Sequence, residues 1–284
     1  MVSSSGSPRV DAESDFMRAR RHQVLAALAA RLRNDTDDVV QSMSFDEVVE
    51  ALGRRAESYL GTKLIPLDAI VGSVDKVRDF DRRFRPTSGR SRQRWERLSR
   101  ASRTGEVIPP IDVYQVGDYY FVRDGHHRVS VARSLRLDVI EAHVTAIDTF
   151  LAPVGIGARA DLERKYWRRL MLQRVPFTGE ARAAVAVDDP FDYGVIAETV
   201  EAWAARTMHA EGAYFDKSTM AARWYAEEFR PVVDMIEDAG VRGEDERPAE
   251  AYLRVAGERY RLIREHEWNT EIMEAVTRKG KKLR

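Results

Sequence analysis

The amino-terminal part of the chain has apolar residues at helical intervals. Between about residues 15 and 33 the recurring positions are Phe16, Leu25, Leu28 and Leu32. This spacing predicts an amphipathic helix, because residues three or four apart share one face of a helix. Ser44 and Glu47 form a capping-box pattern that predicts the start of a second, short helix, which Gly53 would end. The serine-rich residues 1–12 have little to bury and are predicted to be disordered.

The pattern changes between residues 60 and 148, where short β-type runs alternate with helical ones. The predicted elements are a strand and turn over residues 63–71, a helix over 91–104, strands over 111–116 and 119–123, a helix through 129–135 and a strand over 139–147. Gly117 and Asp118 separate the two neighbouring strands and predict a β-hairpin. The segment is therefore predicted to form a compact α/β unit.

Beyond Ala152 the apolar residues follow helical spacing almost throughout. The predicted helices cover residues 161–175, 193–209, 216–239 and 248–278. Pro231 is predicted to kink the third of them, and their tryptophans and tyrosines to form a helical core, with a base-stacking platform as the alternative. The predicted fold class is α+β, with a tail over 1–12, a helical lead-in over 13–59, a central α/β domain over 60–148 and an all-helical domain over 152–284.

The composition excludes several classes of protein. The chain has no cysteine, which removes disulfides, thiolate nucleophiles and cysteine-ligated metals. Its longest aliphatic run, residues 24–30, is far shorter than the roughly 20 residues that span a membrane. The N-terminus has no apolar stretch of the secretory type. These features predict a soluble cytoplasmic protein with no membrane partner.

The formal net charge of zero conceals two blocks of opposite charge. Residues 76–103 contain eleven basic and three acidic residues, whereas residues 180–274 contain 22 acidic and 11 basic ones. The arginine-rich segment 76–103 could follow a nucleic-acid backbone. The alternative is a solvated helix face whose arginines meet the acidic carboxy-terminal helices.

The densest group of polar residues lies at a predicted junction between a strand and a helix. Its members are Arg123, Asp124, Gly125, His126, His127 and Arg128. The glycine allows a sharp turn or close approach of a ligand, and the first N–H groups of the helix favour an anion. Arg123 and Arg128 would hold phosphate oxygens. In the structural alternative, Asp124 caps the helix and Arg128 pairs with a neighbouring carboxylate.

The two histidines and Asp124 are the candidates for chemistry at this junction. A helix N-terminus disfavours protonation of His126 or His127, so a neutral imidazole could donate a hydrogen bond or act as a base. Adjacent side chains point apart, and His127 is favoured as the one that faces the ligand. Asp124 is the best-placed carboxylate for Mg²⁺ brought in with a nucleotide; a metal site that adds His143 is the alternative.

The order of these motifs resembles the ParB/sulfiredoxin superfamily over about residues 60–148. The motif Gly125-x-x-Arg128-x-x-x-Ala132 after a hairpin is similar to the ParB glycine-arginine motif. Upstream, the run from Leu64 through Asp68 resembles the opening strand of the family, and Arg78 falls near its early arginine. The form Asp-Gly-His-x-Arg looks closest to a branch that includes a kinase acting on free serine.

The resemblance implies nucleotide binding through Gly125 and Arg128, with Arg78 near the early arginine of the family. Arg123 is a further expected contact because of its place beside the turn. His126 stands where ParB proteins have an acidic residue, which departs from the pattern of CTP hydrolysis. Sulfiredoxins have cysteine at that position, and without cysteine their reductase chemistry is excluded. The expected cofactor is CTP, ATP or ADP with Mg²⁺.

Three functions follow from these expectations. The first is a nucleotide- or phosphate-binding protein that hydrolyses a nucleoside triphosphate or transfers a phosphoryl group. The second is a DNA-associated protein of the partition type, or a nuclease, acting through residues 76–103. The third is an inactive interaction scaffold. The expected partners are a nucleotide, nucleic acid and a second copy of the chain in a homodimer.

Overall fold

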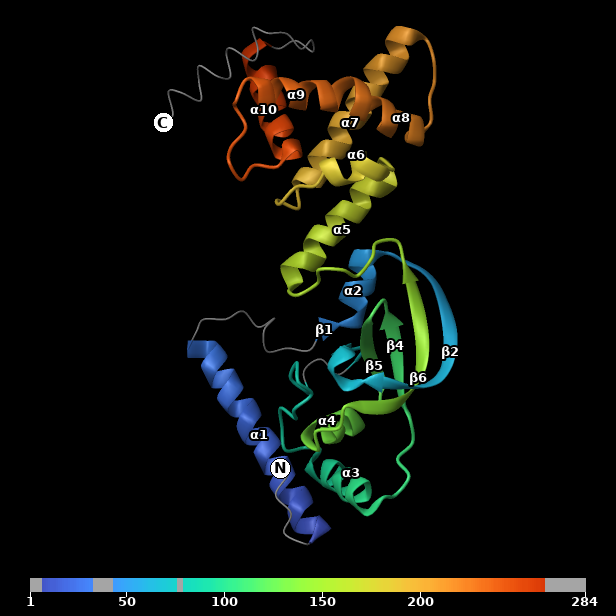
Figure 1. The fold of residues 1–284 in the computed structure, drawn as a ribbon, viewed down its shortest axis with the longest axis vertical. Coiled ribbons are helices and arrows are strands. Elements are labelled where there is room, and N and C mark those ends of the chain that lie inside the picture. Colours follow the sequence, from blue (N-terminus) through green and yellow to red (C-terminus); the bar gives the residue numbers. More distant parts are fainter. Residues whose placement is uncertain (1–6, 33–42, 76–78, 264–284) are drawn as a thin grey trace. The chain divides into compact units, whose positions relative to one another are not determined.

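The computed structural model describes residues 7–32, 43–75 and 79–263. The chain forms two compact units, Met1–Leu162 and Glu163–Arg284 (Figure 1). A six-stranded mixed sheet lies in the first unit and helices make up the second, so the predicted α+β class is confirmed. None of the described helices is both long and apolar enough to cross a membrane.

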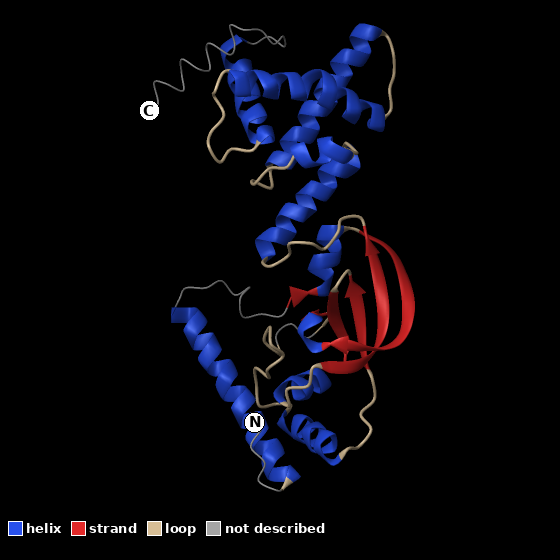
Figure 2. Cartoon of the chain, in the orientation of Figure 1, coloured by secondary structure: helices blue, strands red, loops and turns tan. Residues whose placement is uncertain are grey.

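The sheet of the first unit has the strand order β1-β3-β5-β4-β6-β2 (Figure 2). Its strands are β1 (Met43–Ser44), β2 (Arg54–Pro66), β3 (Ile70–Ser73), β4 (Ile111–Val116), β5 (Tyr119–Asp124) and β6 (Val139–Thr149). β4 and β5 form the predicted antiparallel hairpin. β3 runs parallel to β5 and β4 parallel to β6, while β2 pairs antiparallel with β6. The carboxyl end of β5 therefore lies beside β3 and β4, where the candidate site begins.

Strand β2 is longer than the sequence pattern predicts, because it starts at Arg54 and takes up residues 54–59 of the predicted helical lead-in. Only Ile65 of this strand is buried. An edge strand that is exposed on both faces needs no alternation of apolar residues, which is the signal that identifies a strand. A bulge between Tyr59 and Thr62, with Gly61 at φ 81°, also interrupts its pairing.

Helix α1 (Pro8–Leu32) starts earlier than predicted, so residues 8–12 are helical rather than disordered, while residues 1–6 of the predicted tail lie outside the described residues. Proline suits a first helical turn because it needs no N–H partner there. Phe16 of α1 packs edge-on against Trp95, at 5.6 Å between ring centroids. Trp95 lies on α3 (Arg92–Thr104) and is fully buried.

Helix α4 (His126–Ser134) covers one face of the sheet. The core between them is apolar and consists of Ile65, Leu67, Ile70, Phe84, Ile111, Val113, Val122, Val129, Ala132, Ala142 and Val144. Arg133 of α4 donates hydrogen bonds to the carbonyl oxygens of Leu67 and Ile70 at 2.7 and 2.8 Å. Burial lowers the pKa of this guanidinium. On the other face, α2 (Phe45–Leu52) stacks Phe45 on Tyr114 of β4.

The capping box at the start of α2 is confirmed, because the backbone N–H of Glu47 donates to Ser44 Oγ at 3.5 Å. Gly53, at φ 77°, follows the helix as predicted. The predicted stop of α3 is also confirmed: Gly105 is left-handed and its N–H donates to the carbonyl of Ala101. These short signals work because each satisfies a backbone group that the helix end leaves without a partner.

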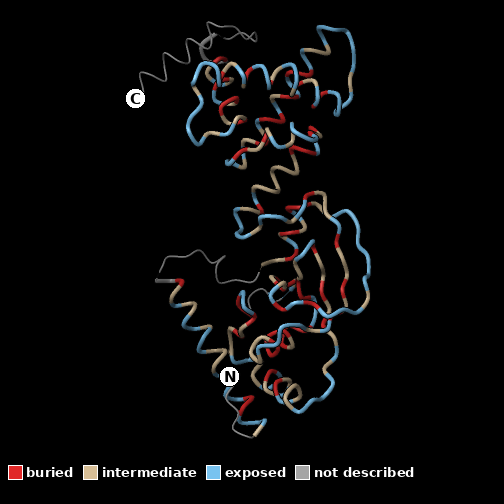
Figure 3. The backbone as a smooth tube through the Cα atoms, in the orientation of Figure 1, coloured by how far each residue is buried: buried red, intermediate tan, exposed pale blue. Residues whose placement is uncertain are grey.

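The second unit is built from helices around an aromatic core. Its helices are α5 (Arg159–Arg174, beginning in the first unit), α6 (Gly179–Ala184), α7 (Asp192–Glu211), α8 (Lys217–Trp224), α9 (Arg230–Asp238) and α10 (Pro248–Ile263). Trp224 is fully buried and lies 5.2 to 5.7 Å from the rings of Phe177, Phe229 and Tyr252. Figure 3 shows short buried stretches that alternate with exposed ones along the helices of this unit. The helical-core interpretation is confirmed for these residues.

Just before Pro231, where the sequence predicts a kink, a π-helical turn over Tyr225–Phe229 separates α8 from α9. The hydrogen-bond pattern of the helix thus changes before the proline. Pro231 lies in the first turn of α9, where a missing backbone N–H removes no hydrogen bond within that helix. The predicted helix over 248–278 is described only as far as Ile263. Trp268, one of the predicted aromatic residues, lies outside the described residues.

Candidate functional site

Gly125 forms the sharp junction between β5 and α4 that the sequence predicts. Its φ of 100° lies in the left-handed region, and a Cβ at this position would come within 2.5 Å of Ile111 Cγ2 and 3.1 Å of Arg128 Nε. Only glycine combines this conformation with this close approach. The N-cap residue of α4 is Gly125, and the Asp124 carboxylate accepts from Arg128 Nη2, so Asp124 does not have the capping role of the structural alternative.

Arg128 is held inside the domain by three acceptors. Its Nη1 donates to the carbonyl oxygens of Pro109, at 2.8 Å, and Pro110, and its Nη2 pairs with the carboxylate of Asp124. The Arg128 side chain is 14% exposed, whereas that of Asp124 is 59% exposed. Arg128 therefore pairs with a neighbouring carboxylate, as in the structural alternative, and it binds the loop before β4 to the start of α4.

Arg123 lies on the opposite face of the sheet from Arg128. Successive side chains of a strand alternate between faces, and the Arg123 guanidinium stands over the ring of Tyr114, 5.6 Å from its centroid. Asp112 forms an ion pair with it at 3.8 Å. A hydrogen bond with Tyr114 raises the pKa of the Arg123 guanidinium. The structure thus does not bring Arg123 and Arg128 together around one phosphate position, and Arg78 lies outside the described residues.

Both histidines are buried in an aromatic cluster. His126 is 3% exposed, and its Nε2 lies 2.6 Å from Ser73 Oγ at the end of β3. The His127 ring is 9% exposed and meets Phe80 edge-on at 5.1 Å. Phe80 also stacks on His126 at 6.0 Å. These contacts fix the start of α4 against β3, and a role of His127 in proton transfer stays a prediction.

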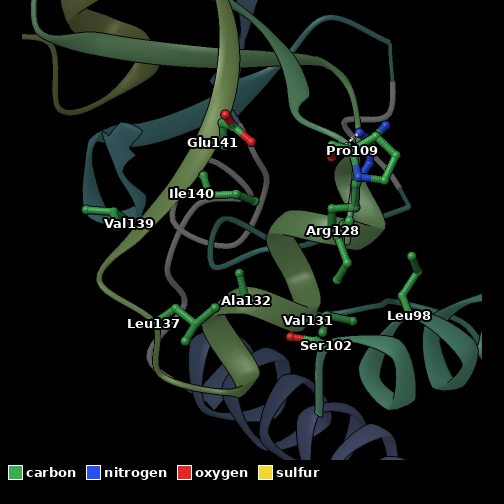
Figure 4. A pocket seen from close by; sticks show the side chains of 11 residues that line it. Leu98, Ser102, Pro109, Arg128, Val131, Ala132, Leu137, Val139, Ile140 and Glu141 are labelled. Atoms are coloured by element: carbon green, nitrogen blue, oxygen red, sulfur yellow. Dashed lines mark hydrogen bonds between the residues drawn. The ribbon is translucent and has the colours of Figure 1, made fainter. Parts of the chain in front are cut away.

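A pocket of about 200 Å³ lies beside Arg128 between α3, α4 and β6 (Figure 4). Its lining is mainly apolar and includes Leu98, Val131 and Ile140, with Arg128 and Glu141 as its charged residues. Small-molecule sites usually measure about 300 to 1,000 Å³. A nucleotide at the Gly125 turn would therefore extend beyond this pocket onto the open surface.

No group of three or more His, Asp or Glu side chains within the described ranges could hold a metal ion. Asp124 is the carboxylate at the turn, and it is paired with Arg128. His143, the other residue of the alternative metal site, bonds instead to Thr62 through Nδ1 at 2.8 Å. Magnesium needs only one or two carboxylates when a nucleotide supplies the other oxygens, so Asp124 is compatible with Mg²⁺ only as part of a nucleotide complex.

The arginine-rich segment separates into paired and exposed arginines. Arg92 pairs with Glu13 and Glu96, and Arg103 pairs with Asp15 and, at 3.9 Å, with Asp11. Within the first unit the acidic partners of these two arginines thus include three residues of α1, which sequence reasoning missed. The available signal was the run of acidic residues at 11, 13 and 15, just before and at the predicted start of the helix.

Three other arginines of α3 remain on the surface and are called the arginine face: Arg94, Arg97 and Arg100. All three are exposed, and no residue in the described part of the chain forms an ion pair with them. Their spacing of three residues places them along one side of the helix. The opposite side carries the buried Trp95 and Ser99.

Comparison with known proteins identifies the central domain. Residues 73–152 match the family model of the ParB N-terminal domain. The matched segment contains α3, the hairpin, the Gly125 turn and β6, so the resemblance to the ParB/sulfiredoxin superfamily is confirmed. It covers less than a third of the chain and says nothing about the helical unit. No curated protein matches the chain.

Proposed function

We propose that this chain, which carries a ParB N-terminal domain, is a ParB-like protein that associates with nucleic acid through the arginine face of α3. The observation that carries this proposal is the set of three exposed arginines without an ionic partner among the described residues, Arg94, Arg97 and Arg100. Guanidinium groups bind phosphate oxygens without reading base sequence. The association is therefore expected to be largely independent of sequence.

The packing of α3 supports a role in which the helix presents these arginines rigidly. Trp95 fixes the inner side of α3, and its Nε1 donates to Ser130 Oγ of α4 at 2.9 Å. Arg92 and Arg103 are engaged with α1, so the helix cannot rotate without breaking these contacts. A helix rises about 1.5 Å per residue, so Arg94 and Arg100 lie roughly 9 Å apart along the helix axis. The arginine face can therefore contact a nucleic-acid backbone over about this length.

The first test is a titration of duplex DNA by fluorescence anisotropy at several salt concentrations. We expect binding to two duplexes of unrelated sequence at about 50 mM salt, with affinity that falls steeply as salt rises, because bound phosphates release counterions. Folded protein that binds neither duplex at 50 mM salt would contradict the proposal.

The position of the Gly125 turn at the N-terminus of α4 favours a second function, the binding of a nucleotide phosphate at this turn. A helix N-terminus favours an anion, and Gly125 at the N-cap has no side chain that could take the place of one. A phosphate that replaced Asp124 as the partner of Arg128 would free this carboxylate to hold Mg²⁺. Hydrolysis or phosphoryl transfer would then depend on neutralising the charge of the phosphate oxygens and on positioning the attacking hydroxyl group or water. His127 or His126 would accept the proton of that attacking group.

Calorimetry with CTP, ATP and ADP, each with and without Mg²⁺, tests this second function. We expect heat of binding from at least one nucleotide, and we expect Arg128→Met to weaken it at least tenfold, since a charge-assisted hydrogen bond contributes about 1.5 to 3 kcal/mol. Arg123→Met, on the opposite face of the sheet, is the matched control. Equal binding by both variants, or no heat from any nucleotide, would reject the site.

A further inference from the structure

A second pocket, of about 310 Å³, lies within the helical unit. It is formed by residues 176–181, which lead into α6, and by α8 with the π-helical turn that follows it (Figure 1). This volume falls at the lower end of the usual range for small-molecule sites. The pocket belongs to the unit that the ParB match does not cover, and it shares no residue with the arginine face or the Gly125 turn.

The inner wall of the pocket is apolar and closely packed. Phe177 and Ala221 line it and are 3% and 2% exposed. The Phe177 ring lies 5.7 Å from the ring of Trp224, in the core of the unit. The next residue, Tyr225, begins the π-helical turn and also lines the pocket. Such turns are rare and are frequent at functional sites, which makes this pocket a candidate for binding.

The polar groups around the pocket present hydrogen-bond acceptors. The Tyr225 hydroxyl donates to the carboxylate of Glu180, and Ser218 Oγ donates to Asp216 Oδ1 at 2.7 Å. A hydroxyl has one hydrogen to donate, so the remaining capacity of Tyr225 and Ser218 is that of an acceptor. An ionised carboxylate accepts only. A ligand that satisfies these groups therefore has to donate hydrogen bonds.

The charge around the pocket is negative. Glu180 is exposed, and no lysine or arginine in the described part of the chain forms an ion pair with it. Burial and the hydrogen bond to Glu180 raise the pKa of the Tyr225 hydroxyl, while Arg230 opposes this change and Asp234 adds to it. Two carboxylates and one guanidinium thus act on this hydroxyl. A ligand with a positive charge suits this surrounding best.

We propose that this pocket binds an alkylammonium ion, that is, a protonated primary amine on a short apolar chain. The ammonium group donates hydrogen bonds and accepts none, which matches the acceptors of Glu180, Ser218 and Tyr225. It forms an ion pair with Glu180, and the apolar chain lies against Phe177 and Ala221. A free amine and the lysine side chain of a peptide share this chemistry.

Isothermal titration calorimetry with n-pentylamine near neutral pH tests the proposal. The expected dissociation constant is about 1 mM or lower. n-Pentanol, which has the same apolar chain without the charge, is expected to bind at least tenfold more weakly. Glu180→Gln keeps the shape of the side chain and is expected to weaken pentylamine at least tenfold, because it removes a charge-assisted hydrogen bond. Glu198→Gln is the matched control, an exposed carboxylate of α7 outside the pocket, and should bind as wild type does.

Tyr225→Phe provides a second variant, which keeps the ring and removes the hydroxyl. It is expected to weaken pentylamine less than Glu180→Gln does, because the carboxylate remains. Nα-acetyl-lysine methylamide separates the two sources of the amine: binding as tight as that of pentylamine assigns the site to lysine side chains, and weaker binding assigns it to free amines. Three results would each overturn the proposal in protein shown to be folded by circular dichroism: no binding of pentylamine, equal binding of pentanol, or equal binding by Glu180→Gln and wild type.

Discussion

Gly125→Ala is expected to destabilise the first unit by about 2 to 5 kcal/mol. The left-handed backbone at φ 100° costs an L-residue about 1 to 2 kcal/mol. The added Cβ would also lie 2.5 Å from Ile111 Cγ2 and 2.9 Å from Ile111 Cβ, and overpacking of this kind typically costs about 1 to 3 kcal/mol. Ile111 is fully buried in the core, so it has little room to move.

Urea denaturation followed by circular dichroism measures this change. Gly105→Ala is the matched control, because Gly105 also has a positive φ of 74° but nothing within 4 Å of the added Cβ. Gly105→Ala should therefore show only the backbone cost, and the difference between the two variants gives the cost of the close approach. Equal destabilisation by both variants would mean that the contact between the turn and Ile111 is not tight.

Trp95→Ala is expected to cost about 3 to 5 kcal/mol, the range for removal of a fully buried aromatic side chain. Trp95 is 0% exposed and contacts Phe16 of α1 and Ser130 of α4. Three helices thus meet at this one side chain. Its loss is expected to loosen α1 as well as α3, and so to increase amide hydrogen exchange along the first half of α1.

Trp95→Phe separates packing from hydrogen bonding in the same experiment. It keeps an aromatic ring beside Phe16 but removes the N–H that donates to Ser130 Oγ. Its expected cost is smaller than that of Trp95→Ala, because most of the buried apolar surface is retained. If Trp95→Ala unfolds at the same urea concentration as wild type, Trp95 does not anchor α3, and the rigid presentation of the arginine face fails with it.

The elements whose signals are local could be predicted from the sequence. The hairpin at Gly117, the capping box at Ser44 and the end of α3 at Gly105 each depend on a few neighbouring residues. Strand β2 and the exposure of Leu25 and Leu28 on α1 could not be predicted in this way. The strand is an exposed edge without alternation. On α1, Phe16 is buried whereas Leu25 and Leu28 are more than half exposed, because helical spacing alone does not tell which apolar residues the domain covers.

At the candidate site, the sequence located the Gly125 turn but not the directions of its side chains. The closeness of Arg123 and Arg128 in the chain suggested a joint phosphate clamp, yet strand alternation sends them to opposite faces of the sheet. The pairing of Arg92 and Arg103 with α1 depends on residues about 80 positions away in the chain. Contacts over such distances are set by tertiary packing, which no local motif records.

The salt dependence of DNA binding by the variant Arg94→Gln, Arg97→Gln, Arg100→Gln tests the central claim most directly. Three lost phosphate contacts should reduce the slope of log affinity against log salt by about 2.7, so wild type should lose about fortyfold more affinity than the variant between 50 and 200 mM salt. Arg206→Gln with Arg230→Gln, two exposed arginines of the helical unit, should leave the slope unchanged. A triple variant with the slope and affinity of wild type would contradict the account.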